Sequence, residues 1–129
     1  MKVAAIIYNI LKSDASITGY VSDRIYPLVA PQNVVTPFII HVQTGNSPYD
    51  SKTGPSTMDV AMATVIIIHE NMDTVEDIAE AARTALDRYS GNISGIDVVS
   101  VQYIDEKPGF DMETGWYSKE LDFRIMAKR

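Results

Sequence analysis

The sequence predicts an α+β fold, namely a mostly antiparallel four-stranded sheet with helices packed on one face. Two stretches repeat apolar residues at helical spacing, and four carry the β-branched or alternating pattern of strands. Their order along the chain is helix, strand, strand, helix, strand, strand, which is typical of this class. The chain of 129 residues is long enough to bury one core, so we expect a single domain over residues 1–129.

Residues 2–12 are predicted to form an amphipathic helix. Its apolar positions recur every three or four residues: Val3, Ile6, Ile7, Ile10 and Leu11. A second short helical turn is expected directly after it. Asp14 can accept hydrogen bonds from the free amides of that turn, and Ile17 and Val21 give the turn an apolar side.

A segment with three spaced prolines follows, beginning at Arg24-Ile25-Tyr26-Pro27 and continuing through Ala30-Pro31 to Pro37. Proline fixes its own φ and pushes the preceding residue out of the helical region. Residues 26–36 are therefore predicted to run as a stiff irregular connector. The connector leads into Pro37-Phe38-Ile39-Ile40-His41, the start of an apolar strand.

Strands are predicted at residues 38–43 and 58–70, and the second is rich in β-branched residues. Residues 44–56 between them contain many Gly, Pro, Ser and Asn residues, so we expect a long loop. Loops of this length are uncommon in compact domains unless they are functional or disordered. Contact with a partner and plain disorder are both open for this loop.

The predicted strand at 58–70 is apolar on both faces. One face carries Val60, Met62, Ile66 and Ile68, and the other carries Ala61, Ala63, Val65 and Ile67. Either the subunit covers both faces itself, or a neighbouring subunit covers the outer one. Two helices are poorly suited to cover two faces, so we favour the neighbour and assign the second set to the outward face.

Residues 74–89 show the clearest helical pattern. The apolar positions on one face are Val75, Ile78, Ala79, Ala82, Ala85, Leu86 and Tyr89. Asp73 and Glu76 have the spacing of a capping box, with Asp in place of the usual Ser or Thr. Arg83 and Arg88 suit the negative end of the helix dipole, and Gly91 is expected to end the helix.

Two further strands are predicted at residues 96–105 and 115–127, joined by an acidic turn that contains Pro108-Gly109. The last strand alternates. Its apolar face carries Tyr117, Leu121, Phe123, Ile125 and Ala127, with Lys119 as the exception, and its polar face carries Ser118, Glu120, Asp122 and Arg124.

The charge pattern argues against tight binding to the phosphate backbone of nucleic acids. The formal net charge is −6, and the 11 basic side chains are scattered singly among 17 acidic ones. Cysteine is absent, which excludes disulfides, thiolate metal ligands and a cysteine nucleophile. Asn9 and Lys12 interrupt the N-terminal apolar run too early for it to cross a bilayer, and no small-residue cleavage site follows. We therefore expect a soluble protein made in the cytoplasm.

Catalytic and metal motifs occur only as incomplete matches. His69-Glu70-Asn71-Met72-Asp73 resembles a zinc-protease motif, but Asp73 stands where the second His ligand belongs. Lys52-Thr53-Gly54 matches one box of the penicillin-recognising enzymes, but the chain contains no Ser-x-x-Lys. His41 or His69 could act as a general base, although both fit ordinary strand positions. We expect no catalytic residue, no metal and no cofactor.

In its order of elements the chain resembles the tail-completion or tail-terminator proteins, the head–tail joining proteins of long-tailed bacteriophages. The resemblance rests on the N-terminal helix, Arg24-Ile25-Tyr26-Pro27 with Ala30-Pro31, the strand led by Pro37, the long hairpin loop, the helix at 73–89 and the ending Leu121-Asp122-Phe123. It covers nearly the whole chain. The chain departs from the family in its second strand, which has more apolar residues.

The resemblance implies a non-enzymatic virion protein of a phage or prophage. Such a protein forms a closed six-fold homo-oligomeric ring at the head-proximal end of the tail, contacts the tail-tube protein and offers its other side to the head connector or stopper protein. DNA passes through the ring without sequence-specific binding, and the protein moves from the host bacterial cytoplasm into the virion tail. We expect the subunit or partner interface at Asn46, Tyr49, Asp50, Lys52, Ala61, Ala63, Val65 and Ile67.

Two other functions stay open on the sequence alone. One is a small ligand-binding or regulatory α+β domain, with a pocket between sheet and helices. The other is a small hydrolase that uses His41 or His69. A cluster of convergent polar residues on the core side would favour either of them, and the sequence indicates none.

Overall fold

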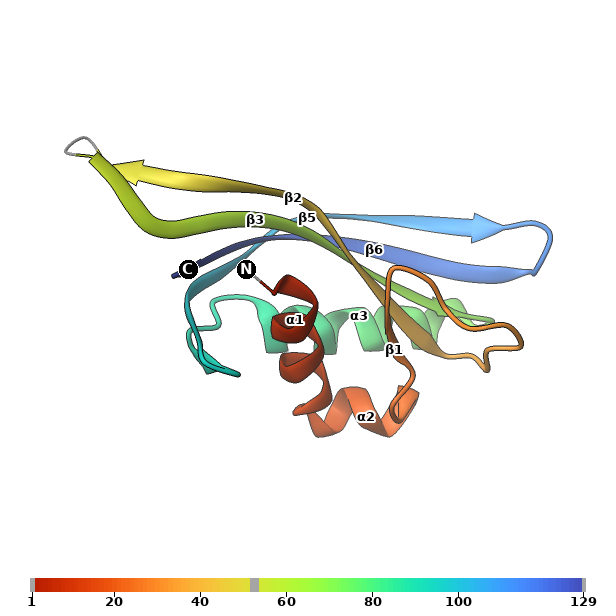
Figure 1. The fold of residues 1–129 in the computed structure, drawn as a ribbon. Coiled ribbons are helices and arrows are strands. Elements are labelled where there is room, and N and C mark those ends of the chain that lie inside the picture. The colour runs from red at the N-terminus through yellow and green to blue at the C-terminus, as the bar shows by residue number, and fades with distance from the viewer. Residues whose placement is uncertain (1, 52–53, 129) are drawn as a thin grey trace.

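The computed structural model describes residues 2–51 and 54–128. Three helices lie on one side of a curved sheet (Figure 1). They are α1 (Val3–Lys12), α2 (Ala15–Val21) and α3 (Met72–Leu86). The strands are β1 (Ile25–Pro27), β2 (Phe38–Ser51), β3 (Gly54–His69), β4 (Gly91–Ile93), β5 (Ile96–Asp111) and β6 (Trp116–Lys128).

The six strands form one sheet in the order β1-β2-β3-β6-β5-β4. Among the described strands, only the β1–β2 pair is parallel. The α+β class and the helices on one face agree with the prediction, but the sheet has six strands instead of four. β1 and β4 were missed because each contains only three residues, too few to show a period of two. The predicted irregular connector at residues 26–36 is wrong at Tyr26 and Pro27, which belong to β1, whereas Leu28 to Thr36 lie outside helices and strands as predicted.

Two of the three helices, α2 and α3, begin at polar side chains that accept backbone N–H groups, whereas α1 begins after Lys2 without a side-chain cap. Asp14 caps α2 as predicted, because its Oδ1 accepts from the N–H groups of Ser16 and Ile17. The cap of α3 differs from the prediction. Asn71 Oδ1 accepts from the N–H groups of Asp73 and Thr74, so the cap lies two residues before the predicted capping box. The helix also ends earlier, at Leu86.

The predicted loop at residues 44–56 is wrong for the part of the chain that the structure describes. β2 continues to Ser51 and β3 begins at Gly54, so the two strands form a long hairpin. A bulge between Gln43 and Gly45 shifts the register, after which cross-strand pairing resumes. Pairing with β3 therefore overrides the low strand propensity of Gly, Asn, Ser and Pro in this segment. Figure 1 shows this hairpin and the β5–β6 hairpin extending in opposite directions beyond the helices.

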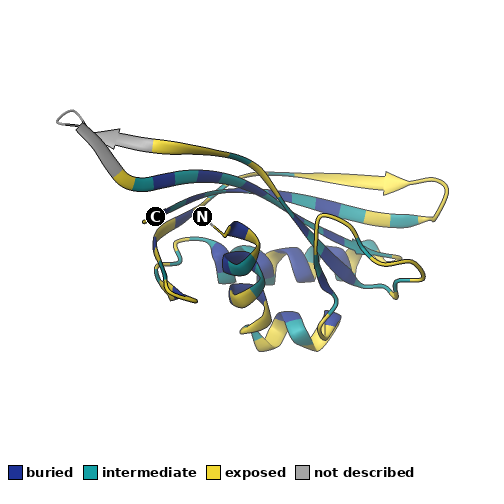
Figure 2. Ribbon diagram, in the orientation of Figure 1, coloured by how far each residue is buried: buried dark blue, intermediate teal, exposed yellow. Residues whose placement is uncertain are grey.

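The hydrophobic core lies between the helices and the inner face of the sheet (Figure 2). The inner face of β3 consists of Ala61, Ala63, Val65 and Ile67, all 0% exposed. The prediction that these four side chains point outward is therefore wrong. Both faces of β3 are apolar, so alternation alone could not identify the inner one. The described helices cover a single face, which leaves Val60, Met62, Ile66 and Ile68 half-buried on the other.

The β6 alternation is confirmed. Leu121, Phe123 and Ile125 are buried in the core, while Asp122 and Arg124 lie half-buried on the outer face. Phe123 stacks edge-to-face on Tyr103 of β5, with ring centroids 5.9 Å apart. Lys119, the predicted exception, points inward with the apolar residues and is 8% exposed.

Candidate functional site: assembly surfaces

The outer face of the sheet carries an apolar lane along β2 and β3. We use the name outer lane for Ile40, Val42, Val60, Met62, Ile66 and Ile68. These side chains are half-buried, Ile40 lies opposite Ile66, and Val42 lies opposite Thr64, the polar residue within the lane. The neighbouring strand β6 carries Glu120, Asp122 and Arg124 on this face, followed by Met126 opposite Val60. An apolar lane beside a polar one is typical of a surface that contacts another protein.

The predicted loop residues are placed on the β2–β3 hairpin or lie outside the described part. Asn46 is exposed, and its Nδ2 lies 3.5 Å from Oδ2 of Asp59 across the hairpin. The backbone of Tyr49 pairs with Met58. Lys52 and the side chains of Tyr49 and Asp50 lie outside the described residues. The structure pairs Asn46 with Ala61 across the hairpin, but Asn46 is exposed whereas Ala61, Ala63, Val65 and Ile67 form core.

Among the described residues, exposed large apolar side chains gather at two further places, while Tyr20 and Val99 are exposed singly elsewhere. One is the free end of the β5–β6 hairpin, where Phe110 and Tyr117 stack with ring centroids 4.9 Å apart and Met112 is 89% exposed. The other is the connector after β1, where Leu28 and Val29 are exposed. The sequence analysis missed both places. The signal was present in the apolar residues Phe110 and Met112 within an otherwise acidic turn.

Among the residues whose burial is described, three polar ones are buried on the inner face: His41, Asp59 and Lys119. Lys119 Nζ donates a hydrogen bond to Glu76 Oε2 of α3 at 2.5 Å and lies 3.4 Å from Glu106 Oε1 of β5. Burial alone would lower the pKa of Lys119, but the hydrogen bond to Glu76 and the charges of Glu106 and Glu76 outweigh it and raise the pKa. Lys119 therefore stays charged and joins α3 to the β5–β6 hairpin.

His41 lies on β2 beneath the start of α1 and is 2% exposed. Its Nε2 is buried without a hydrogen-bond partner. Burial lowers the pKa of His41, because an imidazolium would lose its hydration there. His41 also lines a cavity of about 250 Å³ with Val3, Ala4, Pro27, Leu28 and Gln43.

We expect His41→Phe to make the subunit more stable in mild acid relative to the wild type. The pKa of His41 is lower in the folded chain, so the unfolded chain binds the proton first and wild-type stability falls as pH drops below about 6.5. Phenylalanine has neither the titrating proton nor the unpaired nitrogen, so we expect the free energy of unfolding to rise by about 1 kcal/mol. Urea unfolding between about pH 7 and about pH 5 measures the difference. A difference that does not grow toward low pH contradicts the expectation.

The two histidines lie apart on the sheet. His41 is opposite Val65 of β3, whereas His69 ends that strand four positions further along. Four strand residues span about 13 Å, so the two imidazoles do not form a catalytic pair. Among residues 2–51 and 54–128, no group of three or more His, Cys, Asp or Glu side chains could hold a metal ion.

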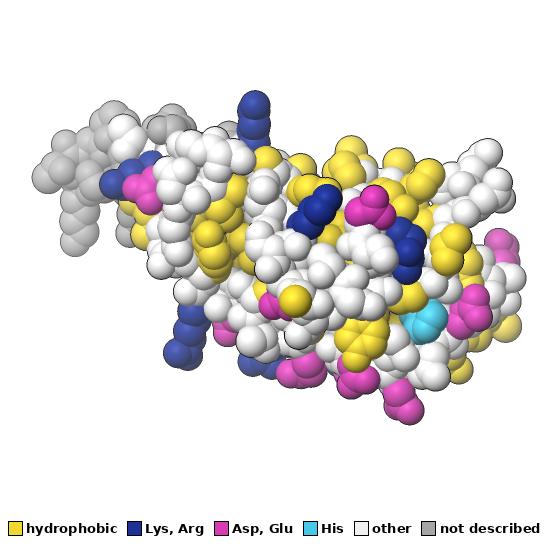
Figure 3. All heavy atoms as spheres, turned by 90° about the horizontal axis from the view of Figure 1, so that it is seen from below, with side chains coloured by type: hydrophobic (Ala, Val, Ile, Leu, Met, Phe, Trp, Pro, Cys, Tyr) yellow, Lys and Arg dark blue, Asp and Glu magenta, His cyan; other side chains and the backbone are white. Residues whose placement is uncertain are grey.

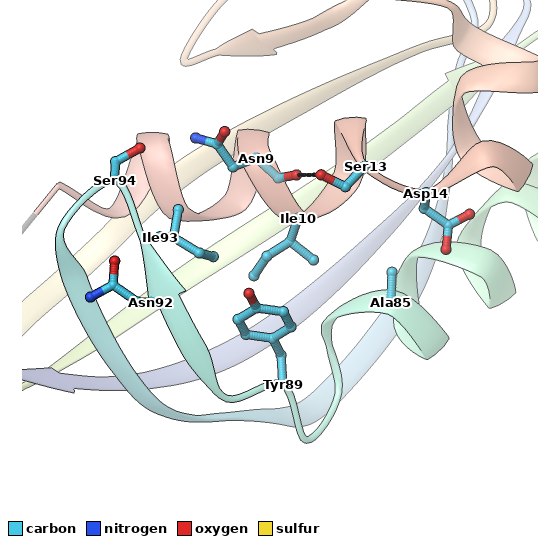
Figure 4. Close-up of a pocket in the computed structure, with 9 residues that line it drawn as sticks. All are labelled: Asn9, Ile10, Ser13, Asp14, Ala85, Tyr89, Asn92, Ile93 and Ser94. Atoms are coloured by element: carbon cyan, nitrogen blue, oxygen red, sulfur yellow. Dashed lines mark hydrogen bonds between the residues drawn. The ribbon is translucent and has the colours of Figure 1, made fainter.

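A second cavity, of about 410 Å³, lies between α1, the end of α3 and β4 (Figure 4). Most of its polar side chains already serve local structure. Asp14 caps α2, Ser13 Oγ donates to the carbonyl of Asn9, and Asn92 Oδ1 accepts from the N–H of Gly95. The cavity is therefore a weak candidate for the ligand-binding function considered above.

Acidic side chains gather along one border of the helix side of the molecule, whereas Lys and Arg are dispersed (Figure 3). This distribution agrees with the net charge of −6. In the part of the chain that the structure describes, no helix is long and apolar enough to cross a membrane.

The subunit is thus an α+β domain with a half-buried apolar lane on its outer sheet face and two hairpins that project beyond the helices. The chain is a member of the tail completion proteins, because the family model described as Tail completion protein gp17 matches residues 5–128. The family assignment made from the sequence is confirmed, and with it a role in phage tail assembly.

Solved structures share the fold. A chain from the virion of a native gene transfer agent particle is 19% identical, with a TM-score of 0.76 and coverage of 95% of this chain and 92% of that chain. A second solved structure, described without a function, is 7% identical with a TM-score of 0.63, covering 96% of this chain and 94% of that one. No curated protein matches the chain in sequence.

Proposed function

We propose that this protein ends tail-tube growth as a closed homo-oligomeric ring, hexameric by resemblance to its family, and joins the tail to the head connector. Membership of the tail completion family supports this role, and the similar chain from a gene transfer agent virion supports a place in a phage-like particle. The protein acts by binding and not by catalysis. It is made in the host cytoplasm and carried into the virion tail.

A ring of identical subunits needs a heterologous interface, in which one patch meets a different patch on the next subunit. The observation that carries the proposal is the position of the two projecting hairpins. β2–β3 extends beyond the helices at one end of the sheet and β5–β6 at the other (Figure 1). Each subunit thus offers different surfaces at its two ends, as a ring requires.

The charge of the subunit suits a passage for DNA. A net charge of −6 repels phosphate, so DNA can slide through the ring without sequence-specific contacts. The outer lane, including Met62 and Ile66, gives an apolar surface for the tail-tube or connector protein. Asn46, which the sequence predicts to lie at an interface, is in this proposal a contact of the projecting β2–β3 hairpin, whereas Lys52 lies outside the described residues.

The proposal is tested by measuring the mass of the purified protein with light scattering over a range of concentrations, and the shape of the particles by negative-stain microscopy. We expect a discrete ring whose mass is a small multiple of 14.3 kDa, at high concentration or with the tail-tube protein added. A protein that remains monomeric under all these conditions, or that forms open filaments, would contradict the closed ring.

A further inference from the structure

Two strand edges of the sheet lack a neighbour over much of their length. β1 pairs with β2 only at Ile39–His41, and β4 pairs with β5 only at Ile96–Val98. The segment after α3 covers part of the remaining β5 edge, through backbone bonds to Val101 and a bond from the N–H of Tyr103 to Asp87. Within the described chain, the outer edges of β2 after His41 and of β5 after Tyr103 therefore keep unpaired backbone groups, which can accept another strand.

The β5 edge ends in exposed apolar side chains. We call residues 104–116 the arm tip. Phe110 is 55% exposed there, and Met112 between Asp111 and Glu113 is almost fully exposed. Phe110 is paired with Tyr117, which alternates in phase with Leu121, so Phe110 lies on the helix side of the sheet. Nothing in the described subunit covers Met112.

The β2 edge becomes free beside the cavity that contains His41. Four of the six side chains that line this cavity are apolar: Val3, Ala4, Pro27 and Leu28. Its volume of about 250 Å³ suits one or two side chains better than a ligand of drug size, which occupies about 300 Å³ or more. Leu28 is 71% exposed at its rim, and His41 Nε2 lacks a partner. The cavity also lies on the helix side of the sheet.

The geometry of the sheet allows these two places to meet in neighbouring copies. β2 and β5 run antiparallel, because three antiparallel pairs separate them. The β5 edge of one subunit can thus extend the sheet of the next along β2, with the helix sides continuous. β1 blocks that edge at His41, so the arm tip would stop beside the cavity. The charges at the two places are of opposite sign. Lys2 precedes the cavity residue Val3, whereas Asp111 and Glu113 flank Met112 in the arm tip.

We propose that the arm tip of one subunit docks on the free β2 edge of a second copy and inserts Phe110 and Met112 into the cavity beside His41. The inference rests on the ring of the proposed function and names its interface. The contact is heterologous, because arm tip and cavity lie on different parts of the chain. Repeating it around the ring closes the assembly without leaving either edge free.

The absence of cysteine allows a direct crosslinking test. The variant Leu28→Cys/Met112→Cys is treated with a short bismaleimide under assembly conditions and analysed on a denaturing gel. We expect a ladder of covalent oligomers up to the full ring. A mixture of the two single variants should stop at dimers, since each subunit then carries one reactive end, and each single variant alone should remain monomeric.

The matched control is Thr84→Cys/Met112→Cys, because Thr84 is an exposed residue of α3 away from the cavity. Native mass is measured on every sample. If rings form but Leu28→Cys/Met112→Cys gives no ladder, the docking is overturned while the proposed ring stands. The same conclusion holds if the control pair gives an equal ladder. Subunits that never assemble overturn both. Loss of the ladder in Phe110→Asp added to the cysteine pair, with the fold retained by circular dichroism, supports the docking.

Discussion

Ala63→Arg is expected to abolish folding of the subunit. Ala63 is 0% exposed on the inner face of β3, between Gln43 of β2 and Phe123 of β6. An arginine there would place a large unpaired charge in the core, and such changes cost about 4 kcal/mol or more, a large share of the stability of a domain of this size. Far-UV circular dichroism and urea unfolding measure the loss.

The matched control for Ala63→Arg is Val60→Arg, because Val60 lies on the same strand but in the half-buried outer lane. We expect Val60→Arg to fold with a loss of about 1 kcal/mol, and to weaken any contact that uses the outer lane. A folded Ala63→Arg subunit that only fails to assemble would contradict the placement of Ala63 in the core. It would restore the original assignment of that face to a neighbouring subunit.

The second large effect is expected from removing both carboxylates beside Lys119. In Glu76→Gln/Glu106→Gln the ammonium group, whose side chain is 10% exposed, loses both charged partners. Breaking a fully buried ion pair from one side costs about 3 kcal/mol, but the Glu76 and Glu106 side chains are 42% and 29% exposed, so solvent screening reduces the expected loss to about 2 kcal/mol. Urea unfolding at neutral pH should show this loss, and each single substitution should show less.

Lys119→Met combined with both glutamine substitutions provides the control, since replacing a buried ion pair by apolar groups is often neutral. We expect this triple variant to regain most of the lost stability.

The contribution of Lys119 to stability also depends on pH, in a direction that follows from its pKa shift. The pKa of Lys119 is raised in the folded chain, so its stabilisation is present below about pH 10.5 and is lost as pH rises through the folded value. Equal stability of double and triple variants would contradict this role.

The sequence predicted the elements in which one pattern is dominant. The apolar faces of α1, α2 and β6 were predicted correctly. Within each of these elements, apolar and polar residues recur clearly at the period of a helix or of a strand. β3 was predicted as a strand but with its faces reversed. Small residues such as Ala61 and Ala63 face α3, whose own buried residues include Ala79 and Ala82, so short side chains let the helix approach the sheet.

The assembly surfaces were less predictable than the fold. The β2–β3 hairpin is made of residues that favour turns, and only pairing between the two strands makes it extended. The cavity beside His41 gathers residues from α1, β1 and β2, which no local motif connects. His41, Asp59 and Lys119 lie buried on the inner face of the sheet, and their burial was not evident from the sequence because polar residues in a strand ordinarily face solvent.

The β5–β6 hairpin, which carries no helix along its outer part, can also serve as a ruler for the diameter of an assembly. Each added residue lengthens a strand by about 3.3 Å, but an odd insertion turns every later side chain to the opposite face. For Phe110 to stay on the helix side of the sheet, the length of the hairpin can therefore change only in steps of two residues per strand, which is about 7 Å. Related proteins that fit tubes of different width would then differ in hairpin length by even numbers, while their helical layer stays the same.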